Sequence, residues 1–295
     1  MAVVINTNVD ALKIQNLLNG STNKMSSSMQ RMSSGLKILS AKDDAAGTVI
    51  SAKMDVQLNG NQIAQKNVQN ANALLSTAEG NLDVVQENIS RIRDLTLQAK
   101  NGTYSSDEIK AMQDEVGERI KEIDRISKSA EYSSLQLFGG SLATTGATFQ
   151  VGADAGENNT IKASEALFKS VEFSMLTGAK KFDLTKLSDV SYGNNSKSTP
   201  THSNDFDKAI DALDQAINDI TSRKSIIGSA GNRMDSALDT LTTQYENLSS
   251  AKSIITDADV AAEASSFTQQ QILQQVSTSL LAQANQAPSI ALSLI

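Results

Sequence analysis

The clearest pattern of apolar and polar positions lies between residues 68 and 92. Apolar residues recur there at alternating steps of three and four: Val68, Ala71, Leu75, Ala78, Leu82, Val85, Ile89 and Ile92. Such a heptad repeat is typical of a helix that packs along one seam against a partner helix. The pattern predicts a continuous helix over 66–99, roughly 50 Å long. Lys100-Asn101-Gly102 is expected to end it.

A second repeat runs from residue 206 to residue 248, again with steps of four and three. Its apolar positions are Phe206, Ile210, Leu213, Ile217, Ile220, Ile227, Met234, Leu238, Leu241, Tyr245 and Leu248, and its exceptions are Lys224 and Gly231. A helix of this length spans roughly 65 Å. Neither seam can be buried by its own helix, so we expect the two helices to pack against each other as antiparallel partners.

Three further helices are predicted from weaker signals. Ser105 and Glu108 form a capping box that begins a helix ending near residue 129. Met25, Met29, Met32 and Leu36 share one face of an N-terminal helix, which is followed by a bend or loop between about 35 and 47. A final helix is expected over about 257–285.

The middle of the chain changes character. Two short apolar segments, 147–151 and 160–163, flank the turn-rich sequence GADAGENN and predict a β-hairpin. Val171 to Ser174 could form another strand, and residues 186–204 form a polar loop. The predicted fold is therefore mainly α: an elongated antiparallel helical bundle or coiled coil from both chain ends, with a small β-hairpin region in the middle.

Composition excludes several classes of function. The net charge is −7 and the isoelectric point is about 4.9, which argues against nucleic-acid binding. No stretch approaches the roughly 18 apolar residues of a membrane span, so no membrane is expected as a partner. The N-terminus lacks the basic region of a secretory signal peptide. With no cysteine, the chain has no disulfide framework and no thiolate metal site.

A catalytic or metal-binding reading finds little support. The only histidine, His202, lies in the polar loop, where a lone histidine is usually solvent-exposed. The carboxylate pairs Asp43-Asp44 and Asp257/Asp259 lack further metal-ligand spacing and are more typical of helix caps. We therefore expect a structural protein without an active site, cofactor or metal. The loop Ser188 to Ser203 is rich in Ser and Thr, and O-linked glycosylation and an unmodified loop remain equal alternatives there.

Apolar residues also occur at both extreme ends, outside the two strong seams. They are Val4, Ile5, Val9, Leu12, Phe267, Leu273, Leu280, Leu281, Leu292 and Leu294. Exposed apolar patches usually mark an interface, although frayed termini are the plain alternative. We hypothesise that these residues form a polymer interface and that the ends become ordered on assembly.

Several long motifs resemble the bacterial flagellin family. They include SAKDDAAG (Ser40 to Gly47), FQVGADAG (Phe149 to Gly156) and LAQANQAP (Leu281 to Pro288). The resemblance covers about 1–165 and 205–295. It implies a filament-core domain from 1–40 and 256–295, and a helical rod domain with a hairpin from 41–165 and 206–255. Residues 166–205 would be a short variable surface segment.

The resemblance also implies a function and partners. Flagellins polymerise into the extracellular flagellar filament for motility, after export in an unfolded state by the flagellar type III apparatus. Partners would be other copies of the chain, an export chaperone, and the cap and junction proteins. The family's contact motif for Toll-like receptor 5 maps onto Arg91, Leu95 and Glu115, with the equal alternative that Arg91 and Glu115 are solvated helix faces and that Leu95 belongs beside the seam at Ile92. A hook–filament junction protein is the alternative, and an adhesin with a coiled stalk would need a larger middle domain.

Overall fold

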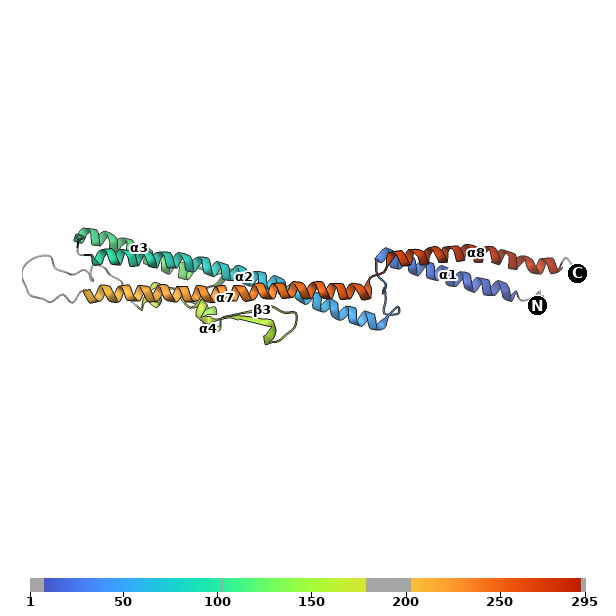
Figure 1. The fold of residues 1–295 in the computed structure, drawn as a ribbon, viewed down its shortest axis with the longest axis horizontal. Helices are drawn as coiled ribbons and strands as arrows, with labels where there is room; N and C mark the ends of the chain where they lie inside the picture. The colour runs from blue at the N-terminus through green and yellow to red at the C-terminus, as the bar shows by residue number, and fades with distance from the viewer. Residues whose placement is uncertain (1–7, 102, 179–202, 293–295) are drawn as a thin grey trace, which may run out of the picture. The chain divides into compact units, whose positions relative to one another are not determined.

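The structure is a computed structural model that describes residues 8–101, 103–178 and 203–292. Its long helices are α1 (Val9–Ser34), α2 (Ala45–Lys100), α3 (Ser106–Ser129), α7 (Ser203–Thr256) and α8 (Val260–Leu292) (Figure 1). The chain forms two compact units, one made of residues 1–58 and 245–295 and the other of residues 59–244. The predicted mainly α fold is confirmed. The assignment of domains by function stays a prediction.

The seam predicted on α2 is confirmed at every position. All eight residues from Val68 to Ile92 are buried, and none is more than 2% exposed. The helix begins 21 residues earlier than predicted, at Ala45, because Asp44 accepts a hydrogen bond from the N–H of Gly47 in the first turn (2.9 Å). Helix α2 ends at Lys100, as predicted from Lys100-Asn101-Gly102.

From Phe206 to Leu241, every second position predicted on α7 is buried and the predicted positions between them are not, while Leu248 at the end of the predicted seam is only half-buried. Phe206, Leu213, Ile220, Ile227, Met234 and Leu241 are buried as expected. Between them the buried residues are Ala209, Ala216, Arg223 and Ala230, each one place before a predicted position. The pattern assigned larger apolar residues, such as Ile210 and Ile217, to the seam. These side chains lie beside the seam and are only half-buried. Small residues in the seam let α2 and α7 approach closely.

Polar pairs fix the register of α2 against α7 in the unit of residues 59–244. Arg93 binds Asp214 (2.5 Å), and Lys100, seven residues later, binds Asp207, seven residues earlier. Ten residues before Arg93, Asp83 binds Lys224, ten residues after Asp214. The same antiparallel alignment therefore holds over this whole length.

Helix α3 begins at the predicted capping box. The Ser105 hydroxyl accepts from the N–H of Glu108, and the Glu108 carboxylate accepts from the N–H of Ser105 (2.7 Å). This contact lowers the pKa of Glu108, because the charged carboxylate accepts the backbone hydrogen bond. Val116, Ile123 and Ile126 are buried and join the core with α2 and α7.

Two small hairpins follow α3. The predicted hairpin is confirmed as β3 (Ala147–Gln150) paired with β4 (Thr160–Ala163), antiparallel, with Phe149 opposite Ile161. The pair β1 (Glu131–Tyr132) and β2 (Leu135–Gln136) was not predicted. Its turn residues, Ser133 and Ser134, have φ values of 50° and 66°, a conformation that sequence rules assign to Gly or Asn.

The segment after β4 belongs to the core. It contains the short helices η2 (Glu165–Phe168) and α5 (Phe173–Thr177), whereas α4 (Leu142–Thr145) precedes β3 and η1 (Glu157–Asn159) lies within the hairpin. Leu167, Phe168 and Val171 are fully buried. The Arg223 guanidinium, itself buried, donates to the carbonyl of Lys169 (2.7 Å). The strand suggested at Val171 to Ser174 is wrong, since α5 begins within it.

The other unit contains the helix pair α1 and α8, which lie side by side (Figure 1). The connection 35–44 leads from α1 to α2, and residues 257–259 lead from α7 to α8. The methionine face predicted on α1 does not form a core, because Met29 is exposed and Met25 and Met32 are half-buried. No helix in the described part of the chain is long and apolar enough to cross a membrane.

Candidate functional site

The contact between α1 and α8 is made by small polar side chains. Among the described side chains of these two helices, the buried ones are Ser21, Ser28 and Ser277. The Ser21 hydroxyl donates to the carbonyl of Gln270 (2.8 Å), and Ser28 lies 3.4 Å from the hydroxyl of Ser266. Serines allow close approach of two helices, but they bury little apolar surface.

Polar pairs also join the two ends of this helix pair. The Asn8 amide donates to the carbonyl of Ala284 (2.8 Å), and Arg31 forms an ion pair with Glu263 (3.2 Å). Asn8 additionally caps α1 by accepting from the N–H of Ala11 (3.0 Å). The pair is therefore aligned by hydrogen bonds along its length and not by an apolar core.

Many large apolar side chains of α1 and α8 remain exposed beside this contact. Those at least 44% exposed are Val9, Leu12, Leu17 and Met29 on α1, and Val260, Ile272, Leu273, Val276 and Leu280 on α8. Ile272, Val276 and Leu280 recur at steps of four, so they share one face of α8. A shallow groove beside them is lined by Ala264, Ser265, Thr268, Gln269, Ile272 and Leu273. We call this set of exposed residues the outer apolar face.

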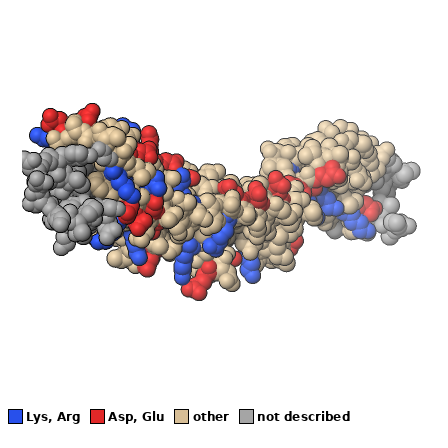
Figure 2. Space-filling view, turned by 60° about the vertical axis from the view of Figure 1, so that its left-hand side comes forward, with Lys and Arg blue, Asp and Glu red and all other residues tan. Residues whose placement is uncertain are grey.

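The outer apolar face of α8 carries no charge. The sequence contains no Asp, Glu, Lys, Arg or His after Glu263. Figure 2 shows a broad uncharged area in the upper part of its right-hand end, with charges of both signs along the lower edge there and over the surface on the left. A soluble helix normally presents charged residues to water, so this face has the composition of a surface that becomes buried.

The interface residues proposed from the sequence fall into three groups. Val9, Leu12, Leu273 and Leu280 are exposed on the outer apolar face. Phe267 and Leu281 are half-buried. Val4, Ile5 and Leu294 lie outside the described residues, as does the side chain of Leu292. The serine contact was not predicted, because serines do not contribute to an apolar pattern. Their spacing of seven residues, from Ser21 to Ser28, is the feature of the sequence that places both on one face of α1.

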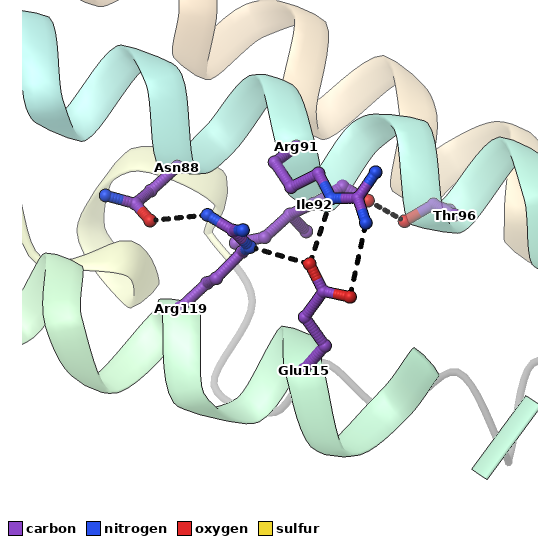
Figure 3. A network of polar contacts seen from close by, with 6 residues as sticks. All are labelled: Asn88, Arg91, Ile92, Thr96, Glu115 and Arg119. Carbon is purple, nitrogen blue, oxygen red and sulfur yellow. Dashed lines mark hydrogen bonds and ion pairs between the residues drawn. The ribbon is translucent and has the colours of Figure 1, made fainter. Parts of the chain in front are cut away.

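A second polar cluster joins α2 to α3 (Figure 3). The Arg91 guanidinium donates twice to the Glu115 carboxylate, at 2.9 and 3.3 Å. Arg119 donates to the same carboxylate (3.1 Å) and to the Asn88 side chain (3.1 Å). The hydrogen bond from Arg91, followed by that from Arg119, lowers the pKa of Glu115, and the same pairing raises the pKa of Arg91. These side chains are partly exposed and present a fixed arrangement of charge.

Leu95 lies apart from this polar cluster. Its side chain is 2% exposed and belongs to the core shared by α2, α3 and α7. The structure thus brings Arg91 and Glu115 together at the surface, whereas Leu95, one turn along α2 from Arg91, is buried in the core.

The acidic pairs act as caps and turn residues. Asp259 accepts from the N–H groups of Ala261 and Ala262 at the start of α8, and Asp43 accepts from the N–H of Ser40 (3.0 Å). Within the described ranges, no group of three or more His, Cys, Asp or Glu side chains is arranged to hold a metal ion. His202 and residues 188–202 of the Ser/Thr-rich loop lie outside those ranges.

Comparisons with known proteins agree with this arrangement of terminal helices. The bacterial flagellin N-terminal helical region matches residues 5–143, and the bacterial flagellin C-terminal helical region matches residues 210–295. The chain is 36% identical to a flagellin of Xenorhabdus nematophila over the full length of both chains. It is 35% identical to a flagellin of Bacillus subtilis (strain 168) over 99% of each.

Its fold is similar to that of a solved protein from Vibrio parahaemolyticus that has been assigned as a flagellar hook-associated protein. The TM-score is 0.56 with 17% identity, over 72% of this chain and 99% of the other. That likeness concerns the fold alone, whereas the sequence matches extend over both ends of the chain. On those matches, the chain belongs to the bacterial flagellin family.

Proposed function

We propose that the chain polymerises into the extracellular flagellar filament through the outer apolar face of α1 and α8. Flagellins are structural subunits of that filament and not enzymes, and membership of the family supports the same role here. The observation that carries the proposal is the burial pattern of the terminal helix pair, which is the reverse of that in an ordinary protein core. Serines are buried between α1 and α8, and leucine, isoleucine and valine side chains are exposed.

The energetics favour burial of this face in an assembly. Fully burying one exposed Leu, Ile or Val side chain contributes about 1.5–3 kcal/mol, and nine large apolar residues are exposed on the two helices. The absence of charge after Glu263 removes the cost of desolvating ionised groups on α8. Repeated contacts between different surfaces of identical subunits produce an open helical polymer.

Seeded growth tests the proposal. Purified monomer is added to short fragments of native filament, and filament length is followed by electron microscopy and light scattering. The proposal predicts long filaments that extend from the fragments. Monomer that fails to extend them at any salt concentration contradicts the proposal and favours the alternative of a hook–filament junction protein. The likeness to the hook-associated protein does not support that alternative, because at 17% identity it concerns the fold alone.

Export and the remaining partners rest on the family resemblance. We include in the proposal that the chain leaves the cell unfolded through the flagellar type III apparatus and meets a chaperone, cap and junction proteins. A strain that lacks this apparatus should retain the chain inside the cell. Secretion at the normal level from such a strain would contradict this part of the proposal.

Recognition by Toll-like receptor 5 is a further part of the proposal. It is supported by the partly exposed pair Arg91 and Glu115, which could exchange their mutual ion pair for charges on the receptor. Leu95, being buried, would act by supporting the backbone beneath them. The test is a reporter assay in cells that express the receptor, using Arg91→Ala alone and together with Leu95→Ala.

The receptor test needs a control for loss of stability. Leu82→Ala truncates another fully buried leucine of α2, so it should destabilise the core without touching the polar cluster. The proposal predicts that both Arg91→Ala variants lose reporter activity and that Leu82→Ala keeps it. Activity that survives the double change unaltered removes the assignment.

A further inference from the structure

In the unit of residues 1–58 and 245–295, the segment that follows the end of α1 pairs with the segment that follows the end of α7. Helix α1 ends at Ser34, and Gly35 adopts a left-handed conformation, with φ of 72°. Helix α7 ends at Thr256. Immediately after these ends, Leu36 and Asp257 form an antiparallel β-bridge.

The bridge is closed by two reciprocal backbone hydrogen bonds. The N–H of Lys37 donates to the carbonyl of Thr256 (2.7 Å), and the N–H of Ala258 donates to the carbonyl of Gly35 (2.9 Å). The last carbonyls of a helix have no partner within the helix. Here the chain that follows each helix supplies a donor to the end of the other.

Each side of the bridge is also held by its own side chains. The Asp257 carboxylate accepts from the hydroxyls of Ser253 (2.6 Å) and Thr256 (2.9 Å). On the other side, the Asp43 carboxylate accepts from the N–H groups of Leu39 (3.2 Å) and Ser40 (3.0 Å). Both connections are therefore fixed in shape by local hydrogen bonds.

Ion pairs lie on both sides of the bridge along the helices. Arg31 of α1 binds Glu263 of α8 at 3.2 Å, and Asp55 of α2 binds Lys252 of α7 at 2.5 Å. The bridge thus sits at the point where the chain passes from one antiparallel helix pair to the next, with a charged pair aligned on each.

The bridge matters because the α1–α8 contact contains few fully buried side chains. That contact buries serines and no large apolar side chain among the described residues. Isolated helices are marginal in water without tertiary packing. Holding the first turns of α8 beside the last turns of α1 shortens the loop that further pairing has to close and so raises the effective concentration of one helix near the other.

We infer that residues 35–37 and 256–258 form a latch that makes α1 and α8 become ordered, and separate, as one cooperative unit. The latch deepens the proposed function, because it is expected to act when the terminal helices are taken up into a filament. Its consequence is that damage on one side of the bridge should loosen the helix on the other side.

Proline variants test the latch, since proline has no backbone N–H. Ala258→Pro removes the donor to Gly35, and Lys37→Pro removes the donor to Thr256. The matched control is Ala41→Pro in the same connection. Ala41 is the second residue of the turn that the hydrogen bond from Asp43 N–H to the Ser40 carbonyl closes (2.9 Å), a position where proline is favoured.

The readout is amide hydrogen exchange of α1 and α8, measured by mass spectrometry. Each isotope-labelled variant is incorporated into filaments with an excess of unlabelled parent, so that a variant need not polymerise alone. We expect each latch proline to speed exchange in both helices by about fivefold, the factor expected for one lost backbone hydrogen bond. The double variant should resemble the stronger single variant, because both changes break the same unit. Ala41→Pro should exchange like the parent.

Exchange that rises only in the helix next to the proline overturns the latch. It is also overturned if the increase in exchange rate of the double variant equals the product of the increases in the two single variants. Unchanged exchange in both latch variants also overturns it. Failure of the parent chain to form filaments would instead contradict the proposed function. In that case the same comparison of α1 with α8 is made on the monomer.

Discussion

At the residue scale, one glycine determines how the β3–β4 hairpin packs on α2. Gly60 faces the hairpin turn, and a Cβ atom at this position would lie 2.7 Å from the Cβ of Ala153. Such a separation is shorter than van der Waals contact, so either α2 or the turn must shift. The glycine is retained in the helix although glycine lowers helix stability.

Gly60→Ala should therefore lower the free energy of unfolding by about 1–2 kcal/mol, the usual cost of overpacking less the gain in helix propensity. Gly80→Ala is the control, because a Cβ there meets nothing within 4 Å. It should raise the stability by about 0.5–1 kcal/mol. Urea denaturation followed by circular dichroism measures both, and equal effects of the two changes would contradict the packing argument.

Glu115 gives the fold a pH dependence. Its folded-state pKa is lowered below the ordinary value of 4.5, first by the hydrogen bond from Arg91. A carboxyl group with a lower pKa in the folded state stabilises the fold above the unfolded-state pKa, and this contribution is lost as the pH falls through the folded-state pKa. The contribution should be present at pH 7 and decline below about pH 4.5.

Glu115→Gln should accordingly reduce the urea midpoint at pH 7 and bring it closer to the midpoint at pH 3. Glu87→Gln changes an exposed carboxyl on α2 and serves as the control. If Glu115→Gln leaves the difference between the two pH values as large as in the parent chain, the ion pair with Arg91 does not contribute to stability.

At the scale of elements, polar pairs set the register of α2 against α7. The Arg93–Asp214 pair is partly exposed, so its removal alone should cost about 0.2–1 kcal/mol. Together with the Asp83–Lys224 pair it disfavours an alignment slipped by ten residues, in which Arg93 would face Lys224 or Asp83 would face Asp214.

Charge reversal tests this register. Arg93→Asp should destabilise the fold by about 1 kcal/mol, because it places two aspartates opposite each other. Adding Asp214→Arg should restore most of that loss. Adding Asp211→Arg makes the same change of charge three residues earlier in α7 and should restore little. Equal rescue by both arginines would mean that net charge, and not alignment, is responsible.

The elements also show what the sequence could predict. The seam from Val68 to Ile92 was predictable because each position is both apolar and periodic. On α7 the periodicity was ambiguous, since Ala209 and Ile210 are both apolar and only packing decides which one is buried. The β1–β2 turn was missed because Ser133 and Ser134 adopt positive φ values without glycine.

The candidate site was predictable only in part, for a related reason. Sequence patterns identified exposed residues of the outer apolar face, such as Leu273 and Leu280, but not the serines that hold α1 to α8. Hydrogen bonds between small polar side chains leave no hydrophobic signal. Likewise, the receptor motif groups Arg91, Leu95 and Glu115 as contacts, whereas the position of Leu95 beside the seam at Ile92 was the signal that its side chain is buried.

At the scale of the whole molecule, the chain divides its apolar residues between two purposes. In the unit of residues 59–244 they fill a core between α2, α3 and α7. In the other unit, nine large apolar residues of α1 and α8 remain exposed, and the fully buried residues among the described side chains of these helices are serines. The first arrangement is that of a subunit that is stable alone, and the second is that of a surface completed by other copies.

The central claim is that the outer apolar face drives polymerisation, and filament growth by a charged variant tests it most directly. Val276→Asp combined with Leu280→Asp places two charges on a face of α8 that has none. Met175→Asp is the control, since Met175 is an apolar residue outside α1 and α8 that is also exposed, at 71%. Circular dichroism of the monomers should show equal helix content.

With parent filament fragments as seeds, Met175→Asp should elongate at the rate of the parent. The double variant should elongate at least about tenfold more slowly, because it buries charge without a partner. Elongation of the double variant at the parent rate would contradict the account.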